Sequence, residues 1–180
     1  MEVAAKILAL PGSLRQHSSS NLILRAITTL APNDVEIEWF AGLGDLPHFN
    51  DPEMDPSSVY EFKQKIKEAD AVLICTPEYA FGIPGSLKNA IDWCVGTGEF
   101  VNKPVGLVTA SSQGEKGHAA LLVVLSAISA SVIDESSLLI SFVRAKIDKE
   151  GNVKDPDLLD RLKTLTFGLK VAADRKKAAL

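Results

Sequence analysis

The sequence is poor in cysteine and carries no excess of positive charge, and both shortages exclude classes of protein. Its two cysteines, Cys75 and Cys94, each lie in an apolar segment that we expect to be buried. We therefore expect no disulfide framework, and the chain suits a reducing compartment, the cytoplasm. The formal net charge is −4 and the isoelectric point is near 5.4. This balance gives no reason to expect nucleic acid or an anionic membrane as a partner.

Long apolar runs and familiar catalytic motifs are also missing. The longest apolar segment, Ala119 to Ile133, is interrupted by Ser126, Ser129 and Ser131. It is shorter than the roughly 18–20 residues that a membrane-spanning helix needs. The sequence shows no Ser-centred nucleophile elbow and no His or Cys spacing typical of a metal site. We therefore expect no membrane span, no metal, and no side chain that serves as a nucleophile or an obligatory base.

What is present has the composition of an ordinary globular protein. Apolar residues make up 46% and charged residues 23% of the 180 residues, which suits one domain spanning residues 1–180. Apolar or alternating segments predict five strands, at Ile7–Leu10, Val35–Trp39, Ala71–Cys75, Val105–Thr109 and within Ser137–Val143. Apolar residues at helical spacing predict helices at about 22–30, 59–69, 87–95 and 158–172, and a long apolar helix follows His118.

This alternation predicts an α/β fold, a doubly wound five-stranded parallel sheet in a three-layer α/β/α arrangement. With five strands the natural order is 2-1-3-4-5, the flavodoxin-like order, whose switch point lies between strands one and three. Val35–Trp39 alternates apolar and acidic residues, so we expect it at an edge of the sheet. In this order the loops after strands one, three and four converge on one crevice, where such sheets bind ligands.

The loop after the first strand is rich in hydroxyl groups. It reads Gly12-Ser13-Leu14-Arg15-Gln16-His17-Ser18-Ser19-Ser20-Asn21 and leads into a predicted helix. The helix N-terminus, the hydroxyls and Arg15 together favour a bound phosphate. A monoester fits better than a pyrophosphate or a triphosphate, since neither Gly-x-Gly-x-x-Gly nor Gly-Lys-Ser/Thr is present. The alternative is that Ser and Asn merely cap the helix and Arg15 is solvated.

The loops after strands three and four suit a flat ligand. Pro77, Tyr79 and Phe81 offer rigid backbone and aromatic faces against which a heteroaromatic ring could lie. Gly114 and Gly117 allow close approach of the backbone. The alternative is that the two aromatic side chains belong to the core or to an interface. Their expected position at the switch point favours a ligand platform.

Two motifs flank this crevice. They read Gly12-Ser13-Leu14-Arg15-x-x-Ser18 and Pro77-Glu78-Tyr79-x-x-Gly82-Ile83-Pro84-Gly85-x-Leu87-Lys88-Asn89-Ala90-Ile91-Asp92-Trp93. Together they resemble the NADPH-dependent FMN reductase family, which includes bacterial quinone, azo-dye and chromate reductases. The resemblance implies a tightly held FMN and ping-pong transfer of hydride from NADPH or NADH to that flavin. A small-molecule acceptor, such as a quinone-like compound, an azo compound or free flavin, would then take two electrons.

The resemblance also implies which residues hold the cofactor. The phosphate would meet the first loop, and the isoalloxazine would lie between the second and third loops. The implied cofactor-binding residues are Ser13, Arg15, Ser18, Ser19, Ser20, Asn21, Leu22, Pro77, Glu78, Tyr79, Ala80, Ser111 and Gly114. The chain departs from the family pattern twice: Ala80 stands where the family often has Asn, and the serine run is one residue longer. Which of the three serines face the phosphate therefore stays open.

Three titratable residues near these loops have simpler explanations than catalysis. His17 and His118 could donate a proton to a reduced acceptor. The simpler explanation is that His17 lies on the rim of its loop and His118 lies at the start of a helix. Glu78 is acidic, so we expect it to hold its loop or a subunit contact and not to face the phosphate.

Two other functions remain open from the sequence. A flavodoxin-type electron carrier would hold FMN without its own site for NAD(P)H. The mild negative charge disfavours this reading, because such carriers usually have a strongly acidic docking face. A regulatory domain of the same topology would bind a phosphate and no flavin, and it would purify without colour.

The helix after Pro84 also predicts an assembly. Leu87, Ile91 and Val95 recur at helical spacing and are expected to face the sheet, which places Trp93 about 200° around the helix on its outer side. Phe81 is a second large apolar group without an obvious partner in the chain. The resembling family also commonly pairs through this region. We therefore expect a homodimer, or a homotetramer of two dimers, with Trp93 in the interface.

Overall fold

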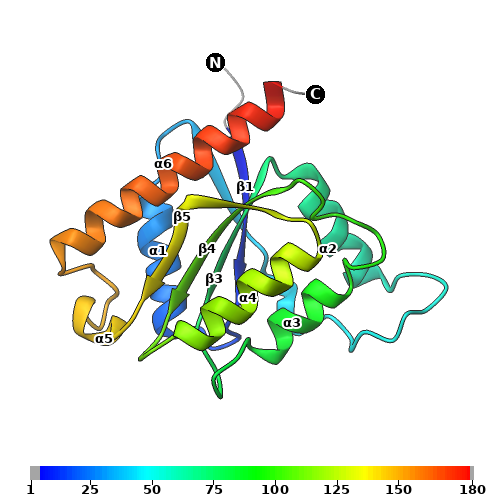
Figure 1. Cartoon of the computed structure of the whole chain (residues 1–180), viewed down its shortest axis with the longest axis horizontal. Coiled ribbons are helices and arrows are strands. Elements are labelled where there is room, and N and C mark those ends of the chain that lie inside the picture. Colours follow the sequence, from blue (N-terminus) through cyan, green and yellow to red (C-terminus); the bar gives the residue numbers. More distant parts are fainter. Residues whose placement is uncertain (1–4, 179–180) are drawn as a thin grey trace.

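The computed structural model describes residues 5–178 and contains a five-stranded sheet between two layers of helices (Figure 1). The strands are β1 (Ala5–Pro11), β2 (Val35–Trp39), β3 (Ala71–Thr76), β4 (Pro104–Ala110) and β5 (Ser131–Ile140). The helices are α1 (Ser19–Leu30), α2 (Ser57–Glu68), α3 (Gly85–Asp92), α4 (Glu115–Ala127), α5 (Val143–Lys146) and α6 (Pro156–Ala178), with a 3-10 turn at Ala41–Gly44. All strand pairs are parallel and the order is β2-β1-β3-β4-β5, which confirms the predicted flavodoxin-like sheet with β2 at an edge.

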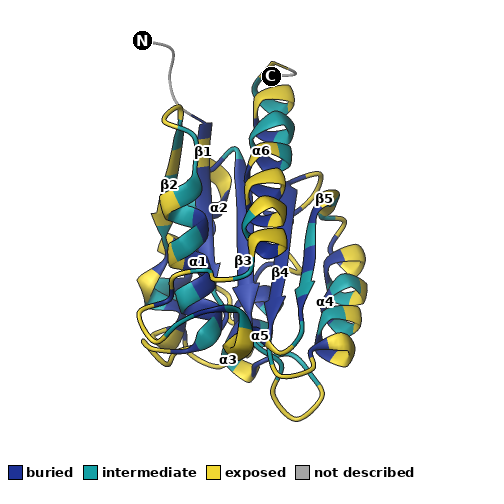
Figure 2. Cartoon of the chain, turned by 90° about the vertical axis from the view of Figure 1, so that its left-hand side faces the viewer, coloured by how far each residue is buried: buried dark blue, intermediate teal, exposed yellow. Residues whose placement is uncertain are grey.

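Each face of the sheet carries its own apolar core. Helices α2, α3 and α4 cover one face with buried side chains such as Phe62, Leu87 and Leu121. Helices α1 and α6 cover the other with Ile23 and Leu162. Strands β3 and β4 are buried along their whole length, as the dark ribbon in Figure 2 shows. Because both faces are covered, these strands are continuous apolar runs and show no alternation of polar and apolar residues.

The apolar segment 119–133 contains the end of α4 and the start of β5, which corrects the expected position of the fifth strand. Helix α4 ends at Ala127, and β5 begins at Ser131 and not within 137–143. Ser129 adopts a left-handed φ of 57°, and the Ala130 N–H donates to the Leu125 carbonyl at 3.0 Å. This is the backbone pattern that ends helices, with Ser in place of the usual Gly. No helix in the described residues is long and apolar enough to cross a membrane.

Trp93, at the end of α3, is buried and not on the outer surface where it was expected. The helix ends at Asp92, and the chain continues through turns from Trp93 to Thr97. Trp93 itself still has helical backbone angles (φ −60°, ψ −22°), and its N–H donates to the Asn89 carbonyl, so the regular spacing is lost only after it. Trp93 is 2% exposed and packs in the core, whereas Val95 is 61% exposed. Trp93 thus lies inside the protomer, and the prediction that it points outward into an interface is wrong.

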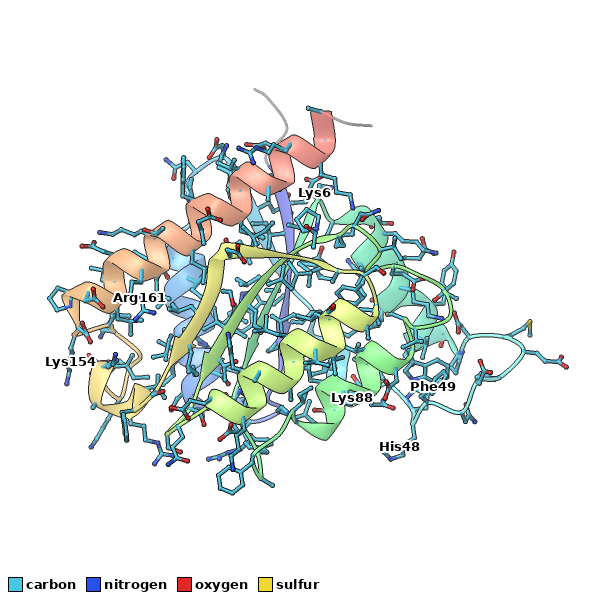
Figure 3. The ribbon with its side chains drawn as sticks, viewed as in Figure 1. Lys6, His48, Phe49, Lys88, Lys154 and Arg161 are labelled. Atoms are coloured by element: carbon cyan, nitrogen blue, oxygen red, sulfur yellow. The ribbon has the colours of Figure 1, made fainter. Side chains whose placement is uncertain are left out.

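The loop after β2 holds the Trp93 side chain in place. The indole Nε1 donates to the carbonyl of Pro47 at 2.9 Å. The ring of Phe49, labelled in Figure 3, meets the indole edge-on at a centroid distance of 5.1 Å. The backbone N–H of Phe49 also donates to Asn89 Oδ1 at 2.8 Å. Segment 45–49 therefore seals the outer side of α3.

Candidate cofactor-binding site

The loops after β1, β3, β4 and β5 surround a cavity of about 500 Å³ at the carboxyl edge of the sheet. Its position is the switch point between β1 and β3, where open α/β sheets bind ligands. The lining residues are Arg15, His17, Ser18, Ser19, Pro77, Glu78, Tyr79, Ala110, Ser111, Ser112, Phe142, Val143, Arg144 and Ala145. The volume lies within the range of about 300–1,000 Å³ that small-molecule sites occupy.

The β1 loop supplies the polar end of the cavity. Ser18 is the N-cap of α1, and its Oγ accepts from the backbone N–H of Asn21 at 3.1 Å. The Ser18 N–H and Asn21 Nδ2 both donate to the carbonyl of Arg15 at 3.0 Å. These bonds hold the loop backbone, while the Arg15 side chain stays exposed at the cavity. First-turn N–H groups of a helix, hydroxyls and a guanidinium form a donor set suited to an anion.

Gly12 allows this loop to lie against the end of β3. A Cβ at position 12 would be 2.3 Å from Thr76 Oγ1, too close for any other residue without displacement. The Gly12 N–H donates to the carbonyl of Cys75 at 2.8 Å. The glycine thus serves a close approach of two chain segments at the switch point.

Several predicted residues of the first loop support the site from beneath. Ser20 is fully buried, with its Oγ 3.1 Å from Ser18 Oγ, and it does not line the cavity. Asn21 is 7% exposed and binds loop carbonyls, while its Oδ1 is buried without a partner among the described residues. Leu22 packs against the apolar core of α1 and α6. Of the serine run, Ser18 and Ser19 face the cavity.

The β3 loop forms a second wall and is tied to both neighbouring loops. Tyr79 Oη lies 3.0 Å from Oγ of Ser13, which is itself nearly buried. Glu78 Oε2 accepts from the backbone N–H of Gly117 in α4 at 2.7 Å. The Glu78 carboxylate therefore has the structural role expected for it.

A tight turn follows at the tip of the β3 loop. Tyr79 and Gly82 exchange two backbone hydrogen bonds, of 3.1 and 2.9 Å. Between them Ala80 and Phe81 both have positive φ, 48° and 60°, which L-residues rarely adopt. Both side chains are exposed and neither lines the cavity. Lys116 Nζ lies 4.2 Å from the Phe81 ring centroid, a cation–π contact.

The loops after β4 and β5 are hydrogen-bonded into a third wall. The Ser111 N–H donates to the carbonyl of Ile140 at 3.1 Å. The N–H groups of Val143 and Phe142 donate to the carbonyls of Ser111 and Ser112, both at 3.1 Å. Gly114, also predicted for the site, is buried at the start of α4 with φ 103° and does not line the cavity. Hydrogen bonds to the β4 loop therefore hold the residues after β5 at the cavity.

The cavity walls carry a positive charge that the chain leaves unpaired. Arg15 and Arg144 both line the cavity, and neither forms an ion pair with any of residues 5–178. Glu78 is the acidic residue among the lining side chains, and its Oε2 accepts from the Gly117 N–H, so the two arginines outnumber it. The electrostatics thus favour a ligand with an anionic group.

The two histidines lie where their structural explanations placed them. His17 is exposed at the cavity rim. His118 lies in the first turns of α4, with Nδ1 2.9 Å from Thr109 Oγ1 and Nε2 3.3 Å from Ser137 Oγ. Burial lowers the pKa of the His118 imidazole, so the neutral ring is favoured. His118 does not line the cavity and instead joins α4 to β4 and β5.

Sequence reasoning missed the contribution of β5. Phe142, Arg144 and Ala145 line the cavity although no motif marks them. The available signal was topological, since β5 is parallel to β4 and its carboxyl end reaches the same edge. The fifth strand was expected within 137–143, so the start of the turn that follows β5 was assigned to the strand.

Topology and cavity together define a flavodoxin-like protein, an open parallel sheet with a ligand site beyond its strand ends. The comparison with known families is more specific. The chain belongs to the NADPH-dependent FMN reductase family, whose model matches residues 5–145. It is accordingly an oxidoreductase with FMN as cofactor and NAD(P)H as reductant.

Individual proteins resemble the chain along nearly its whole length. A quinone reductase of Escherichia coli K12 is 32% identical over 173 residues, covering 90% of this chain and 92% of that protein. A 2-hydroxy-1,4-benzoquinone reductase from a Burkholderia species is 34% identical over 171 residues, with the same coverage. The structure of FerB, a flavoenzyme NAD(P)H:(acceptor) oxidoreductase from Paracoccus denitrificans, aligns with a TM-score of 0.78 and 26% identity over 96% of this chain and 98% of that one.

Proposed function

We propose that the protein reduces a quinone, and free flavin as a second acceptor, in a ping-pong cycle driven by NAD(P)H. The observation that carries the proposal is one cavity that combines an end suited to an anion with a partly apolar wall that includes an aromatic side chain. Arg15 and the capped N-terminus of α1 form the first, and Pro77 and Tyr79 contribute to the second. The relatives named as quinone and benzoquinone reductases support the choice of acceptor.

The residues present fit FMN as the resident group. Arg15, Ser18 and Ser19 would hold its phosphate, with Ser13, Ser20, Asn21 and Leu22 keeping the loop in shape. Pro77, Glu78, Tyr79 and Ser111 would border the ring, with Ala80 and Gly114 shaping the two loops that carry them. FMN, when bound, supplies the hydride chemistry, and the protein supplies binding and orientation. The chain therefore needs no nucleophile of its own.

The test begins with the purified protein. It should be yellow, or bind FMN stoichiometrically, and it should bind FAD much more weakly because the first loop lacks the glycines of a pyrophosphate site. Anaerobic NADPH or NADH should then bleach the flavin, and a quinone should restore its colour. A panel of quinones, azo dyes and free FMN would rank the acceptors. Equal affinity for FMN and FAD would contradict the assigned phosphate site.

The same experiment separates the alternative functions. A flavodoxin-type carrier would bind FMN but would not be reduced rapidly by NAD(P)H alone. A phosphate-binding regulatory domain would bind no flavin. Rapid bleaching by NAD(P)H therefore decides for the enzyme.

We further propose a single cytoplasmic domain, residues 1–180, that assembles as a homodimer or as two dimers. The support for assembly now comes from α4. Its outer side carries Ala119, Val123 and Ala127, and Val123 is 70% exposed. A helix that is apolar on nearly all sides normally has a partner on its outer side as well.

A further inference from the structure

Arg144 is a cavity residue whose role the proposed function does not define. It follows β5 in the short helix α5 and lines the same cavity as Arg15, Ser18 and Ser19. Its side chain is exposed and pairs with no carboxylate among residues 5–178. The next cation of the turn, Lys146, lies 3.6 Å from Asp155 Oδ2. Asp148, the acid nearest along the chain, accepts hydrogen bonds from Asn152, so Arg144 is left unpaired at the cavity.

The backbone that carries Arg144 is firmly anchored. Val143 and Ile147, on either side of it, are 2% and 6% exposed. The N–H of Val143 donates to Ser111, and the N–H of Ala145 donates to the carbonyl of Phe142 at 2.9 Å. A guanidinium presented from such a turn loses little conformational entropy beyond its own side chain when it meets a ligand.

The chain after α5 returns to the start of α1. A Cβ added to Gly151 would lie 3.0 Å from Leu22 Cδ2, so the turn at 148–152 packs directly on the first turns of α1. Figures 1 and 2 show α5 and the beginning of α1 at the same end of the sheet. The turn that carries Arg144 and the first turns of α1 therefore lie at the same edge of the sheet, around one cavity.

The negative charge of a phosphate ligand would be stabilised by a second cation such as Arg144. A phosphate monoester carries roughly −1.5 to −2 charges at pH 7. Arg15 and the N-terminus of α1, which is worth roughly half a charge, together supply about +1.5 and leave up to about half a negative charge unbalanced. A second guanidinium can bind phosphate oxygens with paired hydrogen bonds.

We propose that Arg144, together with Arg15, is the second cation for the phosphate of the bound flavin mononucleotide. The inference rests on the proposed function. It assigns to the β5–α5 turn a specificity role, the preference for FMN over flavins that lack a phosphate. Arg144 acts in binding and takes no part in electron transfer.

The experiment is a titration of the flavin-free full-length protein with FMN and with riboflavin, followed by flavin fluorescence. Arg144→Gln should weaken FMN binding at least tenfold and change riboflavin binding less than twofold. Arg144→Lys keeps the charge but loses the paired hydrogen bonds of the guanidinium, so its FMN affinity should lie between those of the parent and Arg144→Gln. Arg161→Gln is the matched control, because Arg161 (Figure 3) lies on α6 and does not line the cavity. It removes the same charge and should change neither affinity.

Three results would overturn the inference while leaving the proposed function intact. FMN affinity unchanged in Arg144→Gln would remove the residue from the phosphate site. Equal losses for FMN and riboflavin would make it a ring contact or a support of the wall. A raised KM for NADPH with unchanged FMN affinity would assign it to the reductant. A parent protein that binds no flavin would instead overturn the proposed function itself.

Discussion

Arg15 and the loop that carries it can be separated by mutation. Asn21 and Ser18 hold the loop backbone, and the guanidinium makes no bond that the fold requires. Arg15→Ala should therefore weaken FMN binding by about 1.5–3 kcal/mol, the usual range for a charge-assisted hydrogen bond. Riboflavin has no phosphate and should not respond. Fluorescence titration of both ligands measures the difference, and parallel losses would mean that Arg15 supports the loop.

Ala80 is a residue whose backbone conformation suits its side chain poorly. Its φ of 48° lies in the left-handed region, which costs an L-residue about 1–2 kcal/mol and which Asn tolerates better. Ala80→Asn should raise the free energy of unfolding by about 0.5–1 kcal/mol. Ala80→Val should lower it, because β-branched residues avoid this region. Urea unfolding of the three proteins is the measurement, and a stabilised Val variant would contradict the explanation.

At the scale of elements, the end of α3 and segment 45–49 form one packing unit. Trp93 joins them through the Pro47 carbonyl and the Phe49 ring. Trp93→Ala should lower the free energy of unfolding by about 3–5 kcal/mol, the cost of emptying a large buried site. Trp93→Phe keeps most of the packing, loses the hydrogen bond and should cost much less. Denaturant unfolding compares them.

The control for this prediction is the state of assembly. A folded Trp93→Phe variant should have the same mass in solution as the parent, because the indole lies within the protomer. If Trp93→Ala were as stable as the parent, the packing of α3 against the 45–49 segment would have to be reconsidered.

At the scale of the whole molecule, the outer side of α4 is the proposed contact between copies. Val123→Glu places a charge in the middle of that side and should lower the mass measured by light scattering. Val95→Glu is the matched control, since Val95 is also an exposed valine but lies beyond α3. A parent protein that is monomeric would refute the assembly. Equal effects of both variants would remove α4 as its specific site.

The sequence by itself determined the sheet and two walls of the cavity. Continuous apolar runs in β3 and β4 predict strands covered on both faces, and the handedness of βαβ units then leaves few strand orders. The first and second loops were predictable because local rules act there. Ser18 caps its own helix, and Pro77 and Tyr79 directly follow a buried strand. Interactions between near neighbours in the chain need no knowledge of distant segments.

Only the tertiary structure decided the remaining features. Periodicity could not show that segment 45–49 would cover Trp93, which keeps helical backbone angles at the end of α3 and is buried by contacts with Pro47 and Phe49. Segment 119–133 divides into the end of α4 and the start of β5 because Ser129 adopts a left-handed conformation. The Ser131 N–H then donates to the Lys103 carbonyl. Arg144 enters the cavity because the β4 loop binds the turn that carries it. These outcomes depend on contacts between segments far apart in the chain, whose free energy no local pattern expresses.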